Sequence, residues 1–253
     1  MWMHTVPYAL VLPSCVAYAP ARMSDNVRSR KGLSMPIDTA QNVGATFSLQ
    51  SMLAARARSW DVLRDIASRI APGMSEADAA RVTKERLDAA GMQRIWHPSI
   101  LRFGPNTLKT FRQRSAPDTR LGENDIFFVD LGPVFDGHEG DVGDTFVLGD
   151  DPVMHACAQA ARDLFAITAA HWREGVTGKA LYDFADAQAT AMGWRLNHAT
   201  KGHRVGDYPH AVHKAGNLGD LDAEPVPGLW ILEIQIAHPE LPLGAFYEDL
   251  LIA

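Results

Sequence analysis

Residues 126–141 read IFFVDLGPVFDGHEGD, in which Asp130 follows an apolar run and Asp141 ends the stretch. The apolar run 126–131 is short and bounded by polar and turn-forming residues, so it predicts a buried β-strand with Asp130 near its end. The segment 136–140 contains two glycines and predicts a turn, after which Asp141 opens the next strand. A hairpin of this length can return Asp141 to a place beside Asp130. We therefore expect two carboxylates to face one cavity.

Helices and strands form two similar blocks around this hairpin. Apolar residues at helical spacing predict a helix over 49–70, and Ser75 is placed to cap a second helix that ends before Gly91. Further elements are predicted from periodicity, β-branched content and glycine punctuation: strands over 99–103, 126–131 and 145–148, helices over 152–174 and 179–192, and strands over 229–236 and 246–252. This order predicts an α+β fold in which helices are segregated from an antiparallel sheet in each half.

The composition narrows the class of protein. The chain has 253 residues, 47% of them hydrophobic and 21% charged, which is ordinary for a globular domain with a sizeable core. A net charge of −6 argues against nucleic acid as a partner. No run approaches the roughly 18–20 apolar residues of a membrane span, so we expect no membrane association and a cytoplasmic protein. Two cysteines outside any CxxC motif exclude a disulfide framework, and Cys157 is expected to be a small buried apolar residue.

The chain divides into a short leader and one domain. Residues 1–45 alternate proline, serine, asparagine and a small basic cluster without a sustained period. We expect 1–45 to be a poorly ordered leader and 46–253 to form the folded domain.

Two late strands carry acidic residues among apolar ones. Glu233 interrupts the run 229–236, and Glu248 lies in the run 246–252. A carboxylate buried there must be paired, protonated or bound to metal. Four converging carboxylates with the imidazole of His203 would match two divalent ions, and oxygen and nitrogen donors favour Mn, Co, Fe or Zn. The alternative is that Glu233 faces solvent on an edge strand and that both aspartates are ordinary turn residues.

The spacing and order of these residues resemble a known family. Asp130 and Asp141 stand in a D-x-G-x-x-x-x-G-x-x-G-D pattern, followed by His203, His210 and the two late glutamates. This order resembles the pita-bread metallopeptidases, which include methionine aminopeptidases, prolidases, aminopeptidase P and the metal-free creatinases. The resemblance covers residues 49–253 and implies two pseudo-symmetric halves, without the extra amino-terminal domain that several of these relatives carry.

The resemblance also implies a role for each residue. Asp130 would chelate one metal, Asp141 and Glu248 would bridge both, and His203 and Glu233 would complete the second ion. A water bridging the ions would act as the nucleophile, with Glu233 as its base. His210 would stand near the substrate carbonyl and stabilise the tetrahedral intermediate.

The pattern departs from the peptidases at one position. They carry a histidine seven residues beyond the glycine of a G-x-N motif, and counting from Gly104 in Gly104-Pro105-Asn106 places Phe111 there. His97 is near in sequence and could take its place if the loop shifted. A basic segment with Lys109, Arg112 and Arg114 crowds the same loop and hints at an acidic or carboxylate-bearing substrate. We therefore count Phe111, His97 and His210 as candidate substrate-binding residues.

Three functions remain open from the sequence. The first is a dinuclear metal-dependent hydrolase, an aminopeptidase or Xaa-Pro dipeptidase of short peptides. The second is a non-peptidase relative that hydrolyses another amide or acts as creatinase does. The third is a binding protein on the same fold that has lost catalysis, which the retention of all five ligand positions disfavours. The expected partner is a small peptide or amide, and the sequence leaves open whether the chain forms a homodimer.

Overall fold

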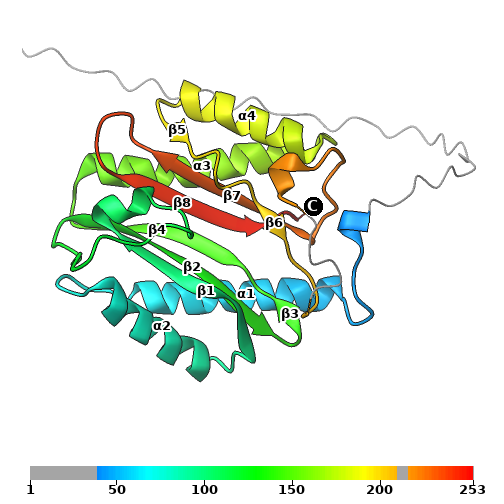
Figure 1. Ribbon diagram of the computed structural model, residues 1–253, viewed down its shortest axis with the longest axis horizontal. Coiled ribbons are helices and arrows are strands. Elements are labelled where there is room, and N and C mark those ends of the chain that lie inside the picture. Colours follow the sequence, from blue (N-terminus) through cyan, green and yellow to red (C-terminus); the bar gives the residue numbers. More distant parts are fainter. Residues whose placement is uncertain (1–38, 210–215, 253) are drawn as a thin grey trace, which may run out of the picture. The chain divides into compact units, whose positions relative to one another are not determined.

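The computed structural model describes residues 39–209 and 216–252. Four long helices and a mixed set of long and short strands follow one another along the chain (Figure 1). The helices are α1 (Leu49–Ala67), α2 (Glu76–Ala89), α3 (Pro152–Trp172) and α4 (Gly178–Ala191). The strands are β1 (Arg94–Phe103), β2 (Asp125–Phe135), β3 (His138–Glu139), β4 (Val142–Leu148), β5 (Arg195–Leu196), β6 (His203–Arg204), β7 (Trp230–Ala237) and β8 (Gly244–Leu250). Short 3₁₀ turns occupy Thr39–Gln41, Gly104–Leu108 and Leu218–Asp220.

The strands form one antiparallel sheet in the order β1-β2-β4-β8-β7-β5, with β3 paired to β2 and β6 paired to β7. Each half of the chain contributes two helices followed by strands, and the halves meet where β4 pairs with β8. The predicted α+β fold, with helices segregated from an antiparallel sheet, is confirmed.

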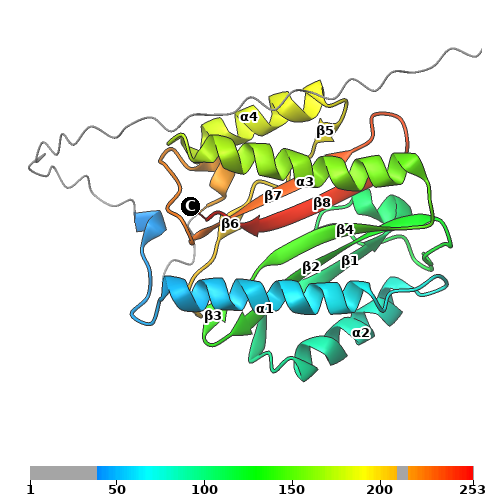
Figure 2. The ribbon, with the colours of Figure 1, turned by 180° about the vertical axis from the view of Figure 1, so that it is seen from behind.

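The helices lie against one face of the sheet, as the view from behind makes plain (Figure 2). Alternate residues of each strand point to this face, because successive side chains of a strand point to opposite sides. On β2 these are Phe127, Val129 and Leu131, which are buried in one core cluster with residues of α1 and α2. On β7, Leu232 and Ile234 belong to a second cluster with residues of α3 and α4. Each half therefore has its own core, and Cys157 is buried in the second, as expected.

The helix boundaries follow from capping residues. Ser75 accepts a hydrogen bond from the Asp78 amide, and the Asp78 carboxylate accepts one from the Ser75 amide, so the capping box forms with Asp in place of the usual Glu. The Ser75 amide and hydroxyl both donate to the Asp78 carboxylate, and together with the ion pair to Arg81 they lower the pKa of Asp78 to about 2. Within the described residues, no helix has both the length and the apolar character to span a bilayer.

Two boundaries differ from the sequence-based expectation. Strand β1 begins at Arg94 rather than at residue 99, because irregularities in its pairing with β2 let the strand continue through Pro98. Residues 39–45, which we grouped with the leader, make specific contacts with the domain. Gln41 accepts hydrogen bonds from the Trp230 indole at 3.0 Å and from the Val226 amide at 2.7 Å.

Candidate metal centre

Three of the predicted ligands lie in one row across the sheet, on the face that the helices leave open. Because Val129 and Leu232 face the helices, their neighbours Asp130 and Glu233 face the other way. The strand register then places Asp130 opposite Gly143, Gly143 opposite Glu248, and Glu248 opposite Glu233. Both halves of the chain therefore contribute carboxylates to one place. Strand β7 is flanked by β8 on one side and by β5 and β6 on the other, so Glu233 does not lie on an edge strand.

Asp141 and His203 complete the group. Asp141 lies just before β4 with its side chain fully buried, and His203 lies on β6, paired with β7. His203 Nε2 is 3.0 Å from Asp141 Oδ2. Glu233 is held from the same side, since its Oε2 accepts a hydrogen bond of 2.8 Å from the amide of Gly202. All five residues that the sequence singled out as metal ligands are thus brought together.

His97 joins this group from β1, which was expected only if a loop shifted. Its Nε2 is 3.3 Å from Asp141 Oδ1 and 3.7 Å from Asp130 Oδ1. The candidate ligand atoms of His97, Asp130 and Asp141 lie within 4.8 Å of one another, as do those of Asp141, His203 and Glu248. The two groups share Asp141, so the geometry provides two adjoining places for a cation.

The carboxylates and imidazoles shift one another's protonation. Burial raises the pKa of Asp130 to about 7 despite the nearby His97, and burial together with Asp130 and Asp141 raises the pKa of Glu248 well above its usual value. Burial also raises the pKa of Glu233. Asp141 behaves in the opposite way, because its two histidine neighbours outweigh burial and lower its pKa.

The histidines respond in the complementary sense. Burial opposes their charged form, but Asp141 and the other carboxylates outweigh it and raise the pKa of His97 to about 10 and that of His203 to about 9. Protons therefore occupy much of this site when no other cation neutralises the carboxylates.

Divalent metal fits this set of donors. Two buried carboxylate oxygens of this group, Asp130 Oδ1 and Glu248 Oε1, accept no hydrogen bond, and Asp141 Oδ2 is faced by His203 Nε2 at 3.0 Å. Buried polar atoms without partners are rare in folded proteins, and converging carboxylate oxygens left in this state are what a cation would satisfy. Four carboxylates carry a charge of −4, which two divalent ions would balance. Oxygen and imidazole donors without thiolate suit Mn, Co, Fe or Zn.

Phe111, which the sequence places where the peptidases carry a histidine, lies at the edge of the site. Its side chain lines a small cavity next to the acidic group, but 63% of its surface is exposed. The same cavity is lined by Lys109 and by the site residues Asp130 and Glu233. The guanidinium of Arg112 lies over the Phe111 ring, with its carbon 5.2 Å from the ring centroid. Arg114 is in the same loop, where its carbonyl oxygen accepts a hydrogen bond from Lys109. His210 lies outside the described residues.

Sequence reasoning missed Gln235, which is 3% exposed and lies two residues beyond Glu233. Its amide nitrogen donates to the carbonyl oxygens of Thr107 and Lys109, so it ties the loop that carries Phe111 to strand β7. The signal was present, because residues two apart on a strand share a face. Tyr182 was also missed. Its hydroxyl donates to the Glu233 carbonyl oxygen at 2.9 Å and accepts from the Glu233 amide at 3.2 Å.

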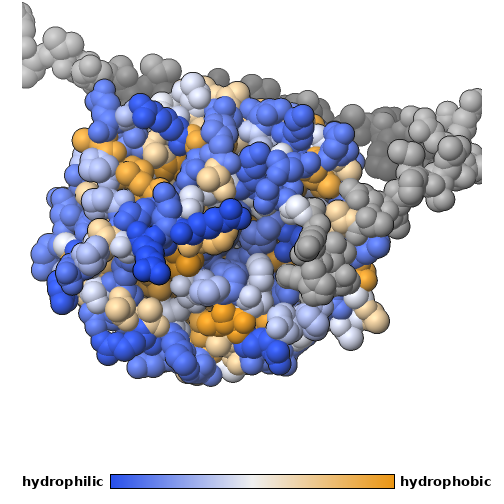
Figure 3. All heavy atoms as spheres, viewed as in Figure 1, coloured by the Kyte–Doolittle hydropathy of each residue, from blue (hydrophilic) through white to orange (hydrophobic). Residues whose placement is uncertain are grey.

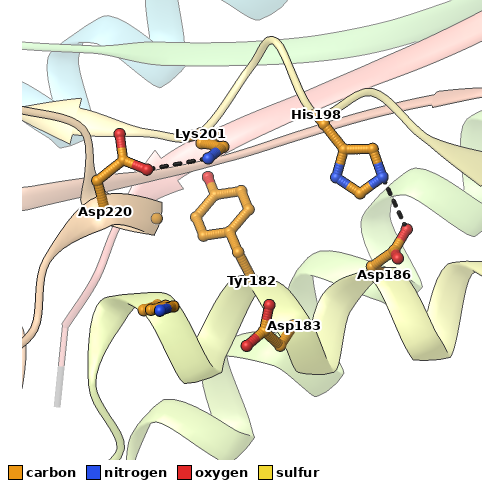
Figure 4. Close-up of a pocket in the computed structure, with 8 residues that line it drawn as sticks. Tyr182, Asp183, Asp186, His198, Lys201 and Asp220 are labelled. Atoms are coloured by element: carbon orange, nitrogen blue, oxygen red, sulfur yellow. Dashed lines mark hydrogen bonds and ion pairs between the residues drawn. The ribbon is translucent and has the colours of Figure 1, made fainter.

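Tyr182 also lines a separate surface cavity of about 290 Å³, between α4 and the chain near Lys201 (Figure 4). Its charged side chains largely neutralise one another, as in the pairs Lys201–Asp220 and His198–Asp186. The sheet face that carries the acidic group is mostly hydrophilic at its surface, with separate apolar patches (Figure 3).

Comparison with known proteins agrees with this arrangement. Residues 50–251 match the model of metallopeptidase family M24. The chain belongs to this family. M24 members are peptidases that typically bind divalent metals, and the resemblance to pita-bread metallopeptidases stated from the sequence is confirmed at the level of the family.

Solved structures share the M24 fold at low identity. A methionine aminopeptidase from Thermotoga maritima superposes with a TM-score of 0.63 at 16% identity, over 81% of this chain and 92% of that one. A prolidase from Pyrococcus horikoshii superposes with a TM-score of 0.64 at 19% identity, over 81% of this chain and 59% of the prolidase. A dipeptidase PepE from Mycobacterium ulcerans superposes with a TM-score of 0.58 at 25% identity, over 80% of this chain and 54% of the dipeptidase. No curated protein matches the sequence.

The chain spans only part of several of these relatives. It covers 56–60% of the X-Pro aminopeptidase from Thermotoga maritima and of the prolidases from Pyrococcus horikoshii and Pyrococcus furiosus. The shared fold therefore locates the M24 domain, and the activity of this chain has to be argued from its own residues.

Proposed function

We propose that the chain is a dinuclear metal-dependent hydrolase that acts on short peptides, as an aminopeptidase or an Xaa-Pro dipeptidase. The observation that supports this most is the convergence of Asp130, Asp141, His203, Glu233 and Glu248, with buried oxygens of Asp130 and Glu248 that accept no hydrogen bond. Membership of family M24 supports the class of reaction.

Each side chain of the site would have a separate role in hydrolysis. When bound, two divalent ions would supply Lewis acidity, which polarises a substrate carbonyl and lowers the pKa of water. Asp141 would face both ions, because its two oxygens point toward different histidines. Asp130 and Glu248 would hold the ions from the first and second halves of the chain. His210 is proposed to face the substrate carbonyl.

Glu233 is our candidate for the general base. Its Oε2 accepts a hydrogen bond from the Gly202 amide, and its backbone is fixed by the Tyr182 hydroxyl, so the carboxylate is held in one orientation. Burial raises its pKa, which improves its ability to accept a proton in the substrate complex.

The test is hydrolysis of a panel of dipeptides, including Xaa-Pro dipeptides, by chelator-treated protein before and after addition of Mn²⁺ or Co²⁺. We expect metal-dependent release of product from wild-type protein. Glu233→Gln should lose this activity, whereas the matched change Glu240→Gln, at an exposed position, should retain it. Absence of metal-dependent product across the whole panel would contradict peptidase activity.

A second function, hydrolysis of another small amide or a creatinase-like reaction, is favoured by the loop at Phe111. This loop lacks the histidine of the peptidases and brings Lys109 to the cavity beside Asp130 and Glu233. A lysine there would suit a substrate with a free carboxylate. The discriminating change is Phe111→His. Gained peptide hydrolysis would indicate a site adapted to another substrate by that residue. A protein that binds metal but hydrolyses neither peptides nor amides would instead be a binding protein on the fold.

A further inference from the structure

We infer that His97 is a sixth protein ligand of the metal centre, bound through Nε2 to the ion that Asp130 and Asp141 hold. This inference rests on the proposed dinuclear centre. With His97 included, each of the two ions would have one imidazole ligand. The five ligands identified from the sequence provide a histidine for only one ion.

The position of the imidazole is the first argument. His97 Nε2 faces Asp141 Oδ1 at 3.3 Å and Asp130 Oδ1 at 3.7 Å. His203 Nε2 faces the other oxygen of Asp141 at 3.0 Å. The two imidazoles therefore flank one shared carboxylate, each on its own oxygen. An ion next to Asp141 Oδ1 would have the His97 nitrogen within its reach without any movement of the strand.

The hydrogen bond on the far side of the ring is the second argument. His97 Nδ1 is 3.0 Å from the carbonyl oxygen of Pro98, which can only accept, so Nδ1 carries the hydrogen of that bond. In the neutral imidazole, the lone pair of Nε2 is then directed at the carboxylates and can bind a cation once the second proton has left. His203 is held in the same manner, with Nδ1 3.3 Å from the Arg204 carbonyl oxygen. Histidines that bind metals usually donate their other N–H to a carbonyl or carboxylate in this way.

The backbone beneath the ring is the third argument. Gly132 lies on β2, two residues after Asp130 and therefore on the same face. A Cβ at Gly132 would lie 2.1 Å from Cδ2 and 2.3 Å from Nε2 of His97. Only a residue without a side chain leaves room for the imidazole to reach the carboxylates.

A local irregularity of the strand supplies the fourth argument. The β1–β2 register shifts on both sides of His97, which lets two consecutive residues serve the same site. The Trp96 ring packs edge-on against both imidazoles, with centroid distances of 4.4 Å to His97 and 5.4 Å to His203. Its Nε1 donates to the carbonyl oxygen of Gly140, next to Asp141. Trp96 is thus a positioning residue for both histidines.

The added imidazole has a chemical consequence. Manganese prefers carboxylate and water ligands, whereas imidazole favours Fe, Co and Zn. His97 should therefore shift the preference of the Asp130–Asp141 ion away from Mn²⁺ and toward Co²⁺ or Zn²⁺.

Cobalt binding to the full chain tests the inference. Chelator-treated wild type, His97→Ala, His97→Gln and the control His198→Ala would be titrated with Co²⁺, and ions and coordinated imidazoles would be counted by calorimetry and X-ray absorption. His198 is an exposed histidine outside the centre, and the Gln variant keeps a polar side chain of similar reach in case Ala impairs folding.

We expect wild type and His198→Ala to bind two Co²⁺ with an average of one imidazole per ion. Both His97 variants should bind one ion at least about 100-fold more weakly, since even outer contacts of metal ligands are worth 10–100-fold. At full loading their imidazole average should fall to about one half. Two ions bound to the His97 variants with wild-type affinity and imidazole count would overturn this inference and leave the dinuclear centre intact. Failure of wild type to bind Co²⁺ would overturn both proposals.

Discussion

Replacement of Asp130 by Asn should stabilise the metal-free protein and weaken its response to metal. The folded-state pKa of Asp130 is about 7, against an ordinary value of 3.8, because the carboxyl is buried next to Asp141. An acid whose pKa is higher in the folded than in the unfolded state lowers the free energy of unfolding at any pH where the unfolded chain is ionised. The penalty is absent below about pH 4, grows between pH 4 and 7, and is complete above pH 7.

The size of this penalty follows from the interval between the two pKa values. Each pH unit across the interval is worth about 1.4 kcal/mol, so roughly three units give on the order of 4 kcal/mol at pH 7. For a domain of this size 1 kcal/mol changes the melting temperature by about 2–4 °C. In chelator at pH 7 the Asp130→Asn protein should therefore melt roughly 10 °C above wild type. At pH 4 the two proteins should melt together.

Metal should remove this advantage. A ligand present at 100 times its Kd stabilises the folded state by about 2.7 kcal/mol, and wild type would gain this from the ion that Asp130 binds, whereas the variant would gain little. The assay is thermal unfolding with chelator and with excess Mn²⁺ or Co²⁺, using Asp61→Asn, an exposed aspartate of α1, as the control. An Asp130→Asn protein that melts below wild type in chelator at pH 7 would refute the reasoning.

Three further predictions concern protonation and stability. Because the pKa of His97 is raised to about 10 and that of His203 to about 9, metal binding at pH 7 should release protons and strengthen as the pH rises from 6 to 9. Calorimetry in buffers of different ionisation heat checks this, and a binding heat independent of the buffer would contradict it. Arg56→Ala should lower the free energy of unfolding by about 3 kcal/mol, since it leaves the carboxylate of Asp249, 4% exposed, without its cation. Urea unfolding measures this loss, and a change below about 1 kcal/mol would show the pair to be dispensable. Ser75→Ala should cost about 1 kcal/mol by the same method through the lost cap of α2, and an unchanged midpoint would count against the capping box.

Much of the fold could be predicted from the sequence because its signals are local. Helical periodicity and caps such as Ser75 fix the helices, and apolar runs fix the long strands. The spacing of Asp130 and Asp141 on a hairpin and the placement of Glu233 in an apolar strand indicated the acidic group. The short strands β5 and β6 were not predicted, because two-residue strands owe their pairing to β7 and not to their own sequence.

The site residues that sequence reasoning misplaced depend on non-local geometry. His97 reaches Asp141 through an irregular strand pairing and through the bare backbone of Gly132, and neither can be seen in the local sequence. The contacts of Tyr182 with the backbone of Glu233 join a helix and a strand 51 residues apart. Such contacts are set by tertiary packing. The sequence pattern predicts which face of a helix or strand is buried, but not which residues of other elements that face contacts.

The number of metal ions per chain tests the central claim most directly. Protein loaded with Mn²⁺ or Co²⁺, freed of excess metal by gel filtration and measured by elemental analysis should contain two divalent ions per chain. A protein that retains none, with protons in place of the ions at pH 7, would contradict the account.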